Sequence, residues 1–385
     1  MRILHVIPSV AERSGGPATA IVPMCRALMQ QGIEVLLLST TEGLSEPNVS
    51  EYKGVPAILF PPQLGASFKY SRPLASWLSS NIRNFDLAHI HAVFNHSSIA
   101  AARACRKAGV PYIIRPLGTL DPWSMTQKSV RKRVFWNISG KAMLRDAAAV
   151  HYTSEVEKLS TEGHLGLNHG KVVALGIDAN TTNGQVRGEP YVLVLSRLHP
   201  KKGLDVLIDA FLLLIENGKL ADWRLIIAGD GPPDYVSKLK AAAASHPDRI
   251  VFTGWLDDDR KHAVLGGASL LALPSHQENF GLCVMEALSH SVPVLVSPNV
   301  NLATEIVSAN AGWISAIDKD ALATRLAEAL SDEDELKKRG RAGKQLSQRY
   351  SWENTATELM DLYRKILPQR RNDAAGDANE SSVAP

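Results

Sequence analysis

The chain has 385 residues, 45% of them hydrophobic, which is enough to bury the cores of two domains. Its three cysteines (Cys25, Cys105 and Cys283) show no paired spacing, which excludes a disulfide framework or cysteine metal site and indicates a reducing compartment. The net charge of +3 hides an asymmetry, because residues 1–185 carry 19 Lys and Arg against 12 Asp and Glu. This basic half predicts an anionic partner, but no nucleic-acid-binding motif accompanies the charge, so we expect no nucleic acid.

The first half alternates short apolar strands with helical patterns, which is typical of a parallel α/β architecture. Residues 1–16 lack the continuous apolar core of a signal peptide, and no apolar run approaches the roughly 18 residues that span a bilayer. We therefore expect a cytoplasmic protein. The expected strands are 2–7, 34–39, 57–60, 87–91, 112–114 and 149–152, and the expected helices are 17–31, 74–84, 97–108, 128–145 and 155–162.

The second half repeats this plan after a polar stretch at 180–189. Its expected strands are 191–195, 224–228, 250–253, 269–273 and 292–296, and its expected helices are 203–217, 234–245, 260–266, 282–289 and 320–330. The predicted fold is α/β, with two Rossmann-like domains (1–180 and 190–350) facing each other across a cleft. A last helix (351–367) crosses back to the first domain, and the polar tail 368–385 is expected to be disordered.

Ligands of such sheets bind at the loops that follow the strands. After the first strand, Gly15 and Gly16 precede Pro17, so backbone amides there can approach a phosphate; an ordinary glycine turn is the alternative. After the first strand of the second half come Arg197 and Lys202, cations suited to a diphosphate, unless this is simply a solvated basic loop. No acidic cluster that would hold magnesium accompanies them.

His89 and His91 share one strand face, so a zinc site is conceivable. No H-E-x-x-H motif or third ligand at helical spacing supports it, and a single histidine reaching the cleft is the favoured interpretation. We expect no metal and no cofactor.

The most informative stretch is 278–286, in which Glu278 and Glu286 flank Gly281. Glu278 is expected in the loop before a helix and Gly281 at the helix entry, where exposed amides form an anion site. A phosphate-binding helix start flanked by carboxylates that accept sugar hydroxyls suits a nucleotide sugar. Taken alone, the spacing also fits two solvated glutamates.

Seven segments in order resemble the retaining glycosyltransferases of family 4, which have the two-Rossmann GT-B fold. The resemblance covers roughly residues 1–366. It rests on the Gly15-Gly16 loop, HIHA, SRLHPKKG, AGDGP, FTGWL, LPSHQENFGLCVMEAL and YSWENTATELMDLYRKIL.

The resemblance implies a role for each matching position. Arg197 and Lys202 would grip the donor diphosphate, Glu278 the hydroxyls of the transferred sugar and Glu286 the ribose. Gly15 and Gly16 would approach the phosphate from the facing domain, and His91 would lie near the reacting side of the sugar. The backbone amides that would hold sugar and phosphate belong to Asn279, Phe280, Gly281 and Leu282.

The segment 115–123 resembles a bacterial subgroup that makes surface polysaccharides, which points to Arg115, Asp121 and Trp123 on the acceptor side. Many relatives have a histidine where this chain has Leu117, so that role is unassigned. The following segment, 128–145, mixes six cations with apolar residues. One interpretation is that it contacts an anionic membrane at the cytoplasmic face, where a lipid-linked acceptor would be located. The alternative is that it packs on its own domain with a solvated basic face.

The predicted function is transfer of a hexosyl-type sugar, with retention, from a UDP- or GDP-sugar to a glycan or lipid-linked acceptor in polysaccharide or lipopolysaccharide biosynthesis. The alternatives are a nucleotide-sugar 2-epimerase of the same fold and a non-catalytic protein that binds nucleotide sugars. The sequence names neither the donor nor the acceptor.

Overall fold

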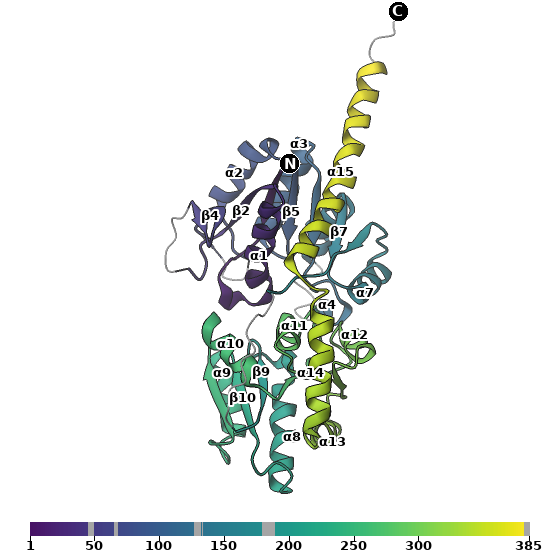
Figure 1. Cartoon of the computed structure of the whole chain (residues 1–385). Helices are drawn as coiled ribbons and strands as arrows, with labels where there is room; N and C mark the ends of the chain where they lie inside the picture. Colours follow the sequence, from purple (N-terminus) through teal and green to yellow (C-terminus); the bar gives the residue numbers. More distant parts are fainter. Residues whose placement is uncertain (45–49, 65–67, 127–131, 133, 179–188, 381–385) are drawn as a thin grey trace, which may run out of the picture. The chain divides into compact units, whose positions relative to one another are not determined.

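A computed structural model describes residues 1–44, 50–64, 68–126, 132, 134–178 and 189–380, and only the backbone of 368–380. The chain forms two compact units, each with its own sheet (Figure 1). Unit 1 comprises Met1–Gly176 and Trp352–Pro385, and unit 2 comprises Ile177–Ser351. The polar stretch at 180–189 falls almost entirely outside the described residues.

Unit 1 is built on an eight-stranded sheet of order β3-β4-β2-β1-β5-β6-β7-β8. All neighbouring pairs are parallel except β3 and β4. Parallel strands need both faces covered, and the central strands β5, β6 and β7 are correspondingly buried throughout. The strands are β1 (Arg2–Val6), β2 (Glu34–Thr40), β3 (Glu51–Tyr52), β4 (Val55–Phe60), β5 (Leu87–His91), β6 (Tyr112–Arg115), β7 (Ala149–Tyr152) and β8 (Gly170–Val172).

Helices of unit 1 begin at residues that suit the N-cap position, a capping side chain for α3 and α7 and a glycine for α1. The Asn95 side chain caps α3 by accepting from the Ser98 amide at 3.0 Å, and Ser154 caps α7 in the same way. The elements are η1 (Glu12–Ser14), α1 (Gly16–Gln30), α2 (Arg72–Asn81), η2 (Ile82–Asn84), α3 (His96–Ala108), α4 (Pro122–Thr126), η3 (Trp136–Gly140), α6 (Lys141–Arg145), α7 (Glu155–Leu165) and α15 (Trp352–Glu380).

Helix α15 returns to unit 1 and lies beside α1 (Figure 1). The Gln31 side-chain amide donates to the Glu353 carbonyl and to Thr357 Oγ1, both at 3.1 Å. Near the other end of the contact, the buried Tyr363 hydroxyl lies 2.8 Å from His89 Nδ1. The backbone of the helix continues to Glu380, and the disorder that we expect from residue 368 stays a prediction.

Unit 2 has a six-stranded, fully parallel sheet of order β11-β10-β9-β12-β13-β14. In sequence order this is the 3-2-1-4-5-6 arrangement of a Rossmann fold, which reverses direction between β9 and β12. The strands are β9 (Tyr191–Leu195), β10 (Arg224–Ala228), β11 (Ile250–Gly254), β12 (Leu270–Leu273), β13 (Val294–Val296) and β14 (Gly312–Ile314).

The helices of unit 2 enclose a core that includes Phe211 from α8, Leu270 from β12 and Leu326 from α13. The elements are η4 (Pro200–Lys202), α8 (Leu204–Glu216), α9 (Pro233–Ala242), α10 (Asp258–Gly267), α11 (Leu282–Ser289), α12 (Ala303–Ser308), α13 (Lys319–Leu330) and α14 (Glu333–Ser347).

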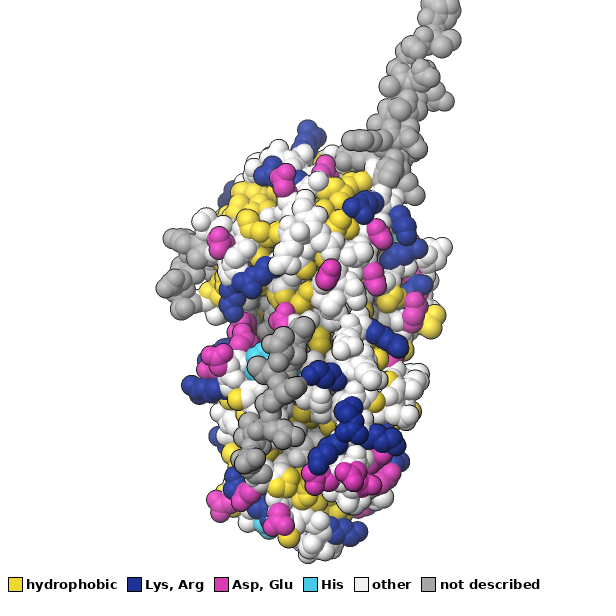
Figure 2. Space-filling model, viewed as in Figure 1, with side chains coloured by type: hydrophobic (Ala, Val, Ile, Leu, Met, Phe, Trp, Pro, Cys, Tyr) yellow, Lys and Arg dark blue, Asp and Glu magenta, His cyan; other side chains and the backbone are white. Residues whose placement is uncertain are grey.

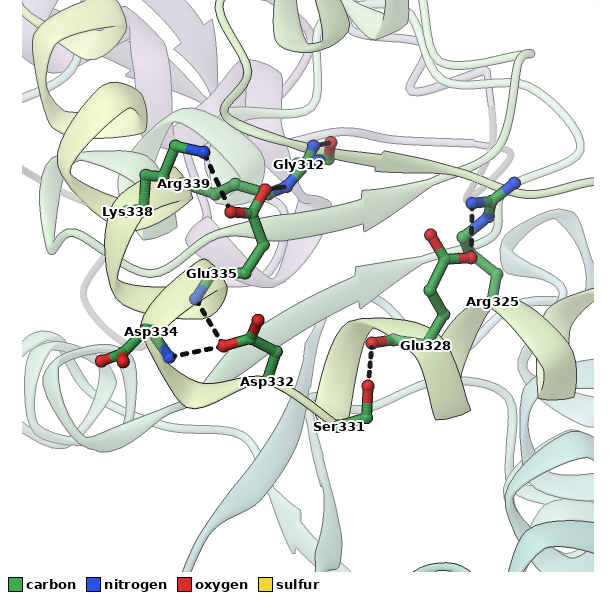
Figure 3. A network of polar contacts seen from close by, with 9 residues as sticks. All are labelled: Gly312, Arg325, Glu328, Ser331, Asp332, Asp334, Glu335, Lys338 and Arg339. Atoms are coloured by element: carbon green, nitrogen blue, oxygen red, sulfur yellow. Dashed lines mark hydrogen bonds and ion pairs between the residues drawn. The ribbon is translucent and has the colours of Figure 1, made fainter.

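Basic and acidic side chains lie side by side over α13 and α14 (Figure 2). The Glu335 carboxylate accepts hydrogen bonds from Lys338 Nζ at 3.2 Å and from Arg339 Nε at 2.8 Å (Figure 3). Arg339 also donates to the Gly312 carbonyl at 2.5 Å, and its guanidinium lies 4.3 Å from the centroid of the Trp313 ring. Arg339 thereby fastens α14 to β14.

The predicted fold class is confirmed, including the helix that returns to the first unit. Of the predicted helix 128–145, residues 128–131 and 133 lie outside the described part. The described remainder is helical, with a π-helical turn at η3. Within the described residues, none of the helices is both long and apolar enough to span a membrane.

Candidate functional site

The strongest candidate site in unit 2 lies where the strand order reverses, between the loops that follow β9 and β12. These loops are joined directly, since the His276 amide donates to the Lys201 carbonyl at 2.8 Å. Gly203 makes the approach possible, because a Cβ there would lie 2.3 Å from the Pro274 carbonyl oxygen. The site therefore occupies the position at which open α/β sheets bind ligands.

Lys202 and Glu278 form an ion pair between these two loops. Their side chains are only 14% and 16% exposed, so the pair is largely shielded from water. Burial raises the pKa of Glu278, but the charges of Lys202, Lys201 and Arg197 more than offset this and hold the pKa below its usual value. Glu278 is therefore ionised in a site of positive potential.

The backbone of Glu278 is fixed by a third loop, which follows β13. The Glu278 amide donates to the Asn299 carbonyl, and the Asn301 amide donates to the Glu278 carbonyl, both at 3.0 Å. Three strand-end loops thus determine where this carboxylate lies.

Helix α11 starts immediately afterwards, with Gly281 as its N-cap at φ 73°. No side chain among the described residues caps it by a hydrogen bond, which leaves the first amides of the helix available to an anion. Phe280 is buried against the edge of Tyr350, and Asn279 contacts Asn301 through its side chain at 3.4 Å. The prediction that Glu278 precedes the helix and Gly281 begins it is confirmed.

Glu286 lies one turn into α11, where Lys261 of α10 approaches it at 3.2 Å. Lys261 also contacts Asp258 at 3.2 Å. Burial lowers the pKa of Lys261, but the two carboxylates more than offset this and raise the pKa above its usual value. Glu286 thus presents its carboxylate, beside a lysine, at the side of the same helix.

Arg197 follows β9 and is exposed. The next residue, Leu198, anchors the loop through a 2.8 Å bond from its amide to the Asp230 carbonyl. Arg197 is thus an exposed cation on an anchored loop, near enough to Glu278 to lower the pKa of that carboxyl.

The corresponding point of reversal in unit 1 lies between β1 and β5. Gly15 is the N-cap of α1 and Gly16 its first residue, again without a side-chain cap among the described residues. His91 ends β5, and Ala92 turns the chain with φ 77°, a conformation that costs a residue with a Cβ roughly 1 kcal/mol.

The His91 side chain points into the core of unit 1, where it is fully buried with His5, His89 and His151. His151 Nε2 donates to the Val173 carbonyl at 2.8 Å, which makes its Nδ1 an acceptor for His89 Nε2–H at 3.1 Å. His89 Nδ1 then accepts from the Tyr363 hydroxyl at 2.8 Å. These tautomers follow from the fixed acceptor at Val173.

His5 and His91 form a second pair, with His5 Nδ1 and His91 Nε2 3.0 Å apart. Burial, reinforced by the nearby charge of Arg115, lowers the pKa of His5 to about 3. The same two causes lower the pKa of His151 to about 3, and burial lowers the pKa values of His89 and His91. The four imidazoles are therefore neutral at physiological pH.

Nitrogens of His5, His89 and His91 all lie within 4.8 Å of one another, a spacing that admits a metal ion. Both nitrogens of His89 are already hydrogen-bonded, and the cationic Arg115 lies close by. A dication without a carboxylate ligand is unfavourable in such a setting. We interpret the cluster as a neutral hydrogen-bonded network.

Arg115 ends β6 and is only 2% exposed, so its side chain lies inside the unit rather than on an acceptor surface. Burial lowers its pKa to about 10, against the opposing effect of Glu157. Asp121 accepts from the Trp123 amide at 2.9 Å and from the Ser160 hydroxyl at 3.3 Å, which orders the start of α4. Trp123 is half-buried.

The structure thus brings Lys202 and Glu278 into contact, with Arg197 near enough to act electrostatically. It places Glu286 on the adjoining helix and Gly15, Gly16 and His91 in unit 1. Sequence reasoning missed Lys261, whose segment is a run of ordinary surface charges. It also missed the pairing of His5 and His151 with the HIH strand, because these residues are distant in sequence.

Two family profiles match the chain. Residues 15–177 match the family described as Glycosyl transferase 4-like domain, and residues 180–346 match Glycosyl transferases group 1. A D-inositol 3-phosphate glycosyltransferase of Nocardia farcinica is 30% identical over 201 residues, which is 50% of this chain but only 44% of that protein. A phosphatidyl-myo-inositol mannosyltransferase of Mycobacterium leprae is 27% identical, covering 95% of this chain and 97% of the relative.

Solved structures show the same fold over nearly the whole chain. Sucrose-phosphate synthase from Thermosynechococcus elongatus has a TM-score of 0.79 at 18% identity, covering 96% of this chain and 99% of that one. HepE from Anabaena, in complex with UDP and glucose, has a TM-score of 0.77 at 20% identity, covering 94% and 99%. With both halves matched by family profiles and the two-domain fold in place, the chain belongs to the glycosyltransferases of family 4.

Proposed function

We propose that the protein transfers a hexosyl-type sugar from a UDP- or GDP-sugar to a glycan or lipid-linked acceptor, with retention of the anomeric configuration. The observation that carries the proposal is the Lys202–Glu278 pair at the point of strand reversal in unit 2, beside the uncapped start of α11. The cation and the helix start suit the diphosphate of a nucleotide sugar, and the carboxylate suits the hydroxyls of its sugar.

The diphosphate is assigned to Arg197, Lys202 and the first amides of α11. Its negative charge grows as the sugar leaves, and pre-placed cations and amides stabilise this charge more in the transition state than before it. We propose that these groups supply the countercharge without a metal or cofactor. Glu286 is assigned to the ribose hydroxyls, held ready as a charged acceptor by Lys261.

Glu278 is assigned to the transferred sugar. Its ionised carboxylate accepts sugar hydroxyls and stabilises the positive charge that develops on the ring in an oxocarbenium-like transition state. In the proposed front-face step, the bond from the anomeric carbon to the phosphate oxygen breaks. The acceptor oxygen bonds to that carbon on the same face, and the phosphate takes the acceptor's proton.

Nucleotide sugars are expected to stabilise the protein against heat, whereas the free sugars are not. A ligand at 100 times its Kd adds about 2.7 kcal/mol, which raises Tm by roughly 5–10 °C for a domain of this size. The measurement is thermal unfolding with UDP-glucose, UDP-galactose, UDP-N-acetylglucosamine and GDP-mannose, for the wild type and Lys202→Met. Failure of every nucleotide sugar to shift the wild-type Tm contradicts the proposal.

The donor that shifts Tm also separates transfer from epimerisation. Incubated alone and followed by NMR, it should be hydrolysed slowly with release of the nucleoside diphosphate. Conversion to a 2-epimer with the nucleotide still attached identifies an epimerase, and a donor that stays unchanged identifies a non-catalytic binding protein.

We further propose that the segment 128–145, of which the structure describes residues 132 and 134–145, contacts an anionic membrane surface at the cytoplasmic face. Val134 and Ile138 are 53% and 75% exposed and four positions apart, hence on one helix face, whereas Met143 and Leu144 are buried. Lys141 and Arg145 are exposed on the same segment. An exposed apolar face flanked by cations suits the interface of an anionic bilayer.

Val134→Glu/Ile138→Glu should abolish flotation with phosphatidylglycerol vesicles, because it places two anions on the apolar face. Leu159→Glu, on α7 at a side chain that is 69% exposed, is the matched control and should float as the wild type does. Wild-type protein that remains with the soluble fraction in low salt refutes the membrane contact.

A further inference from the structure

In unit 1, residues 63–64 and residue 70 are hydrogen-bonded to each other, and the adjoining Phe68 contacts the start of α3. The Gln63 amide donates to the Tyr70 carbonyl at 2.7 Å, and the Tyr70 amide donates to the Leu64 carbonyl at 3.0 Å. The His96 amide in turn donates to the Phe68 carbonyl at 3.0 Å. Two loops, one after β4 and one after β5, are thereby joined; residues 65–67 lie outside the described part and form no part of the argument.

His96 presents one defined hydrogen-bond donor at this junction. Its Nδ1 accepts from the Ser71 amide at 3.2 Å, so the ring proton of the neutral imidazole sits on Nε2. Burial, together with the charge of Arg103, lowers the pKa of His96, which keeps the neutral form at physiological pH. The side chain is half-buried, so its outer nitrogen is within reach of a ligand.

Two aromatic rings flank this histidine. The centroid of Tyr70 lies 4.4 Å from that of His96, and the centroid of Phe68 lies 5.9 Å away in an edge arrangement. Phe68 is 38% exposed, which is unusual for a large apolar side chain that is also held by ring contacts. Together the rings form a small apolar platform beside a polar donor.

Lys69, between the two aromatic residues, has φ 53°, a strained conformation for a residue with a Cβ. Burial lowers the pKa of its ammonium, an effect opposed by the carboxylate of Glu42. Glu42 belongs to the loop after β2, and its carbonyl accepts from the Ser9 hydroxyl at 3.1 Å in the loop after β1. The cluster thus occupies the carboxyl-end loops of four adjacent strands, β4, β2, β1 and β5.

We propose that Phe68, Tyr70, His96 and Lys69 form a carbohydrate subsite that binds a sugar residue of the acceptor. The apolar face of a pyranose ring packs on the aromatic platform, His96 Nε2–H donates to a sugar oxygen, and the Lys69–Glu42 couple offers a donor and an acceptor to hydroxyls. The assignment to an acceptor rests on the proposed sugar transfer; the binding of sugar to this platform does not.

The test is saturation-transfer NMR with the methyl α- and β-glycosides of glucose, galactose, mannose and N-acetylglucosamine. We expect at least one glycoside to give a signal with the wild type, and this signal to fall at least about fivefold in Phe68→Ala and in His96→Phe. Leu159→Ala, an equally exposed apolar truncation on α7, should keep the wild-type signal. Phe68 is partly exposed, so its variant remains informative even if His96→Phe folds poorly.

Absence of any glycoside signal with the wild type, or equal signals in the wild type and both variants, overturns the subsite. So does a loss of vesicle flotation in Phe68→Ala with its glycoside signal intact, since Phe68 would then be a lipid contact. UDP binding, measured on the same samples, should be unchanged in every variant. Glycoside binding without any nucleotide binding would refute the proposed function and leave the subsite standing.

Discussion

Glu278→Gln is expected to lower the rate of sugar transfer by at least about 100-fold while the protein stays folded. Loss of a single preorganised charge that acts on the transition state costs about 10²–10³ in rate. Glutamine keeps the shape of the side chain and one acceptor oxygen but lacks the negative charge. The expected fall therefore reports the charge of the carboxylate rather than its volume.

The same substitution has a second, independent consequence for stability. It leaves the Lys202 ammonium, only 14% exposed, without its partner, at a cost of about 2 kcal/mol in the free energy of unfolding. The double variant Lys202→Met/Glu278→Gln should recover most of this loss, because no uncompensated charge remains. Urea unfolding of the four proteins in the cycle measures the coupling.

Glu328→Gln provides the matched control. Glu328 pairs with Arg325 at 2.7 Å on the surface of α13, with side chains 55% and 40% exposed, and such pairs contribute little. Its transfer rate and stability should match the wild type. Wild-type turnover in Glu278→Gln would remove Glu278 from the reaction and refute the assignment of the site.

Acid is expected to unfold unit 1 well before it titrates the carboxylates. The folded-state pKa values of the four buried histidines lie below the unfolded value of 6.5, about 3 for His5 and His151. The folded state therefore binds fewer protons, and its stability is complete above pH 6.5 and lost as the pH falls toward 3. Each imidazole that stays neutral in the folded state costs about 1.4 kcal/mol of stability per pH unit below 6.5, so His5 and His151 together cost about 3 kcal/mol at pH 5.5, and His89 and His91 add to this loss.

That cost is a large part of the whole stability of a domain, about 5–15 kcal/mol. The groups that face the network, Arg115 and the neutral Tyr363 hydroxyl, provide no negative charge to hold an imidazolium. The measurement is the free energy of unfolding between pH 7.5 and 5.5. The slope of this free energy against pH gives the number of protons taken up on unfolding, and it should fall by about one proton in His151→Gln. It should stay unchanged in the control His164→Gln, an exposed residue of α7. Stability that is constant over this range would contradict a neutral buried network.

The alternating pattern predicted the sheets well because parallel strands such as β1, β5 and β9 are buried on both faces and read as short apolar runs. It missed α14, a highly charged segment with two internal glycines. The structure explains the glycines: a Cβ at Gly340 would lie 2.0 Å from the Ser291 carbonyl oxygen and one at Gly343 2.5 Å from the Leu288 side chain. The two glycines would weaken an isolated helix, but here they allow α14 to pack closely against α11.

For the site, motif spacing located Glu278 ahead of α11 because a glycine entry and an apolar helix are local features. The pairing of Lys202 with Glu278 and of Lys261 with Glu286 depends on which strands become neighbours, which no local pattern specifies. The histidine network is the clearest case. Its members come from β1, β5 and β7, and its last hydroxyl comes from Tyr363 on a helix 274 residues away from His89.

The most direct test of the account is calorimetric titration of UDP, GDP and ADP into the wild type and into Arg197→Met/Lys202→Met. One nucleoside diphosphate should bind the wild type with a micromolar Kd, and the double variant should bind it at least about 100-fold more weakly, since two charge-assisted contacts to phosphate are lost. Binding of equal strength to both proteins, or no binding of any of the three to the wild type, would contradict the assignment of the diphosphate to this site.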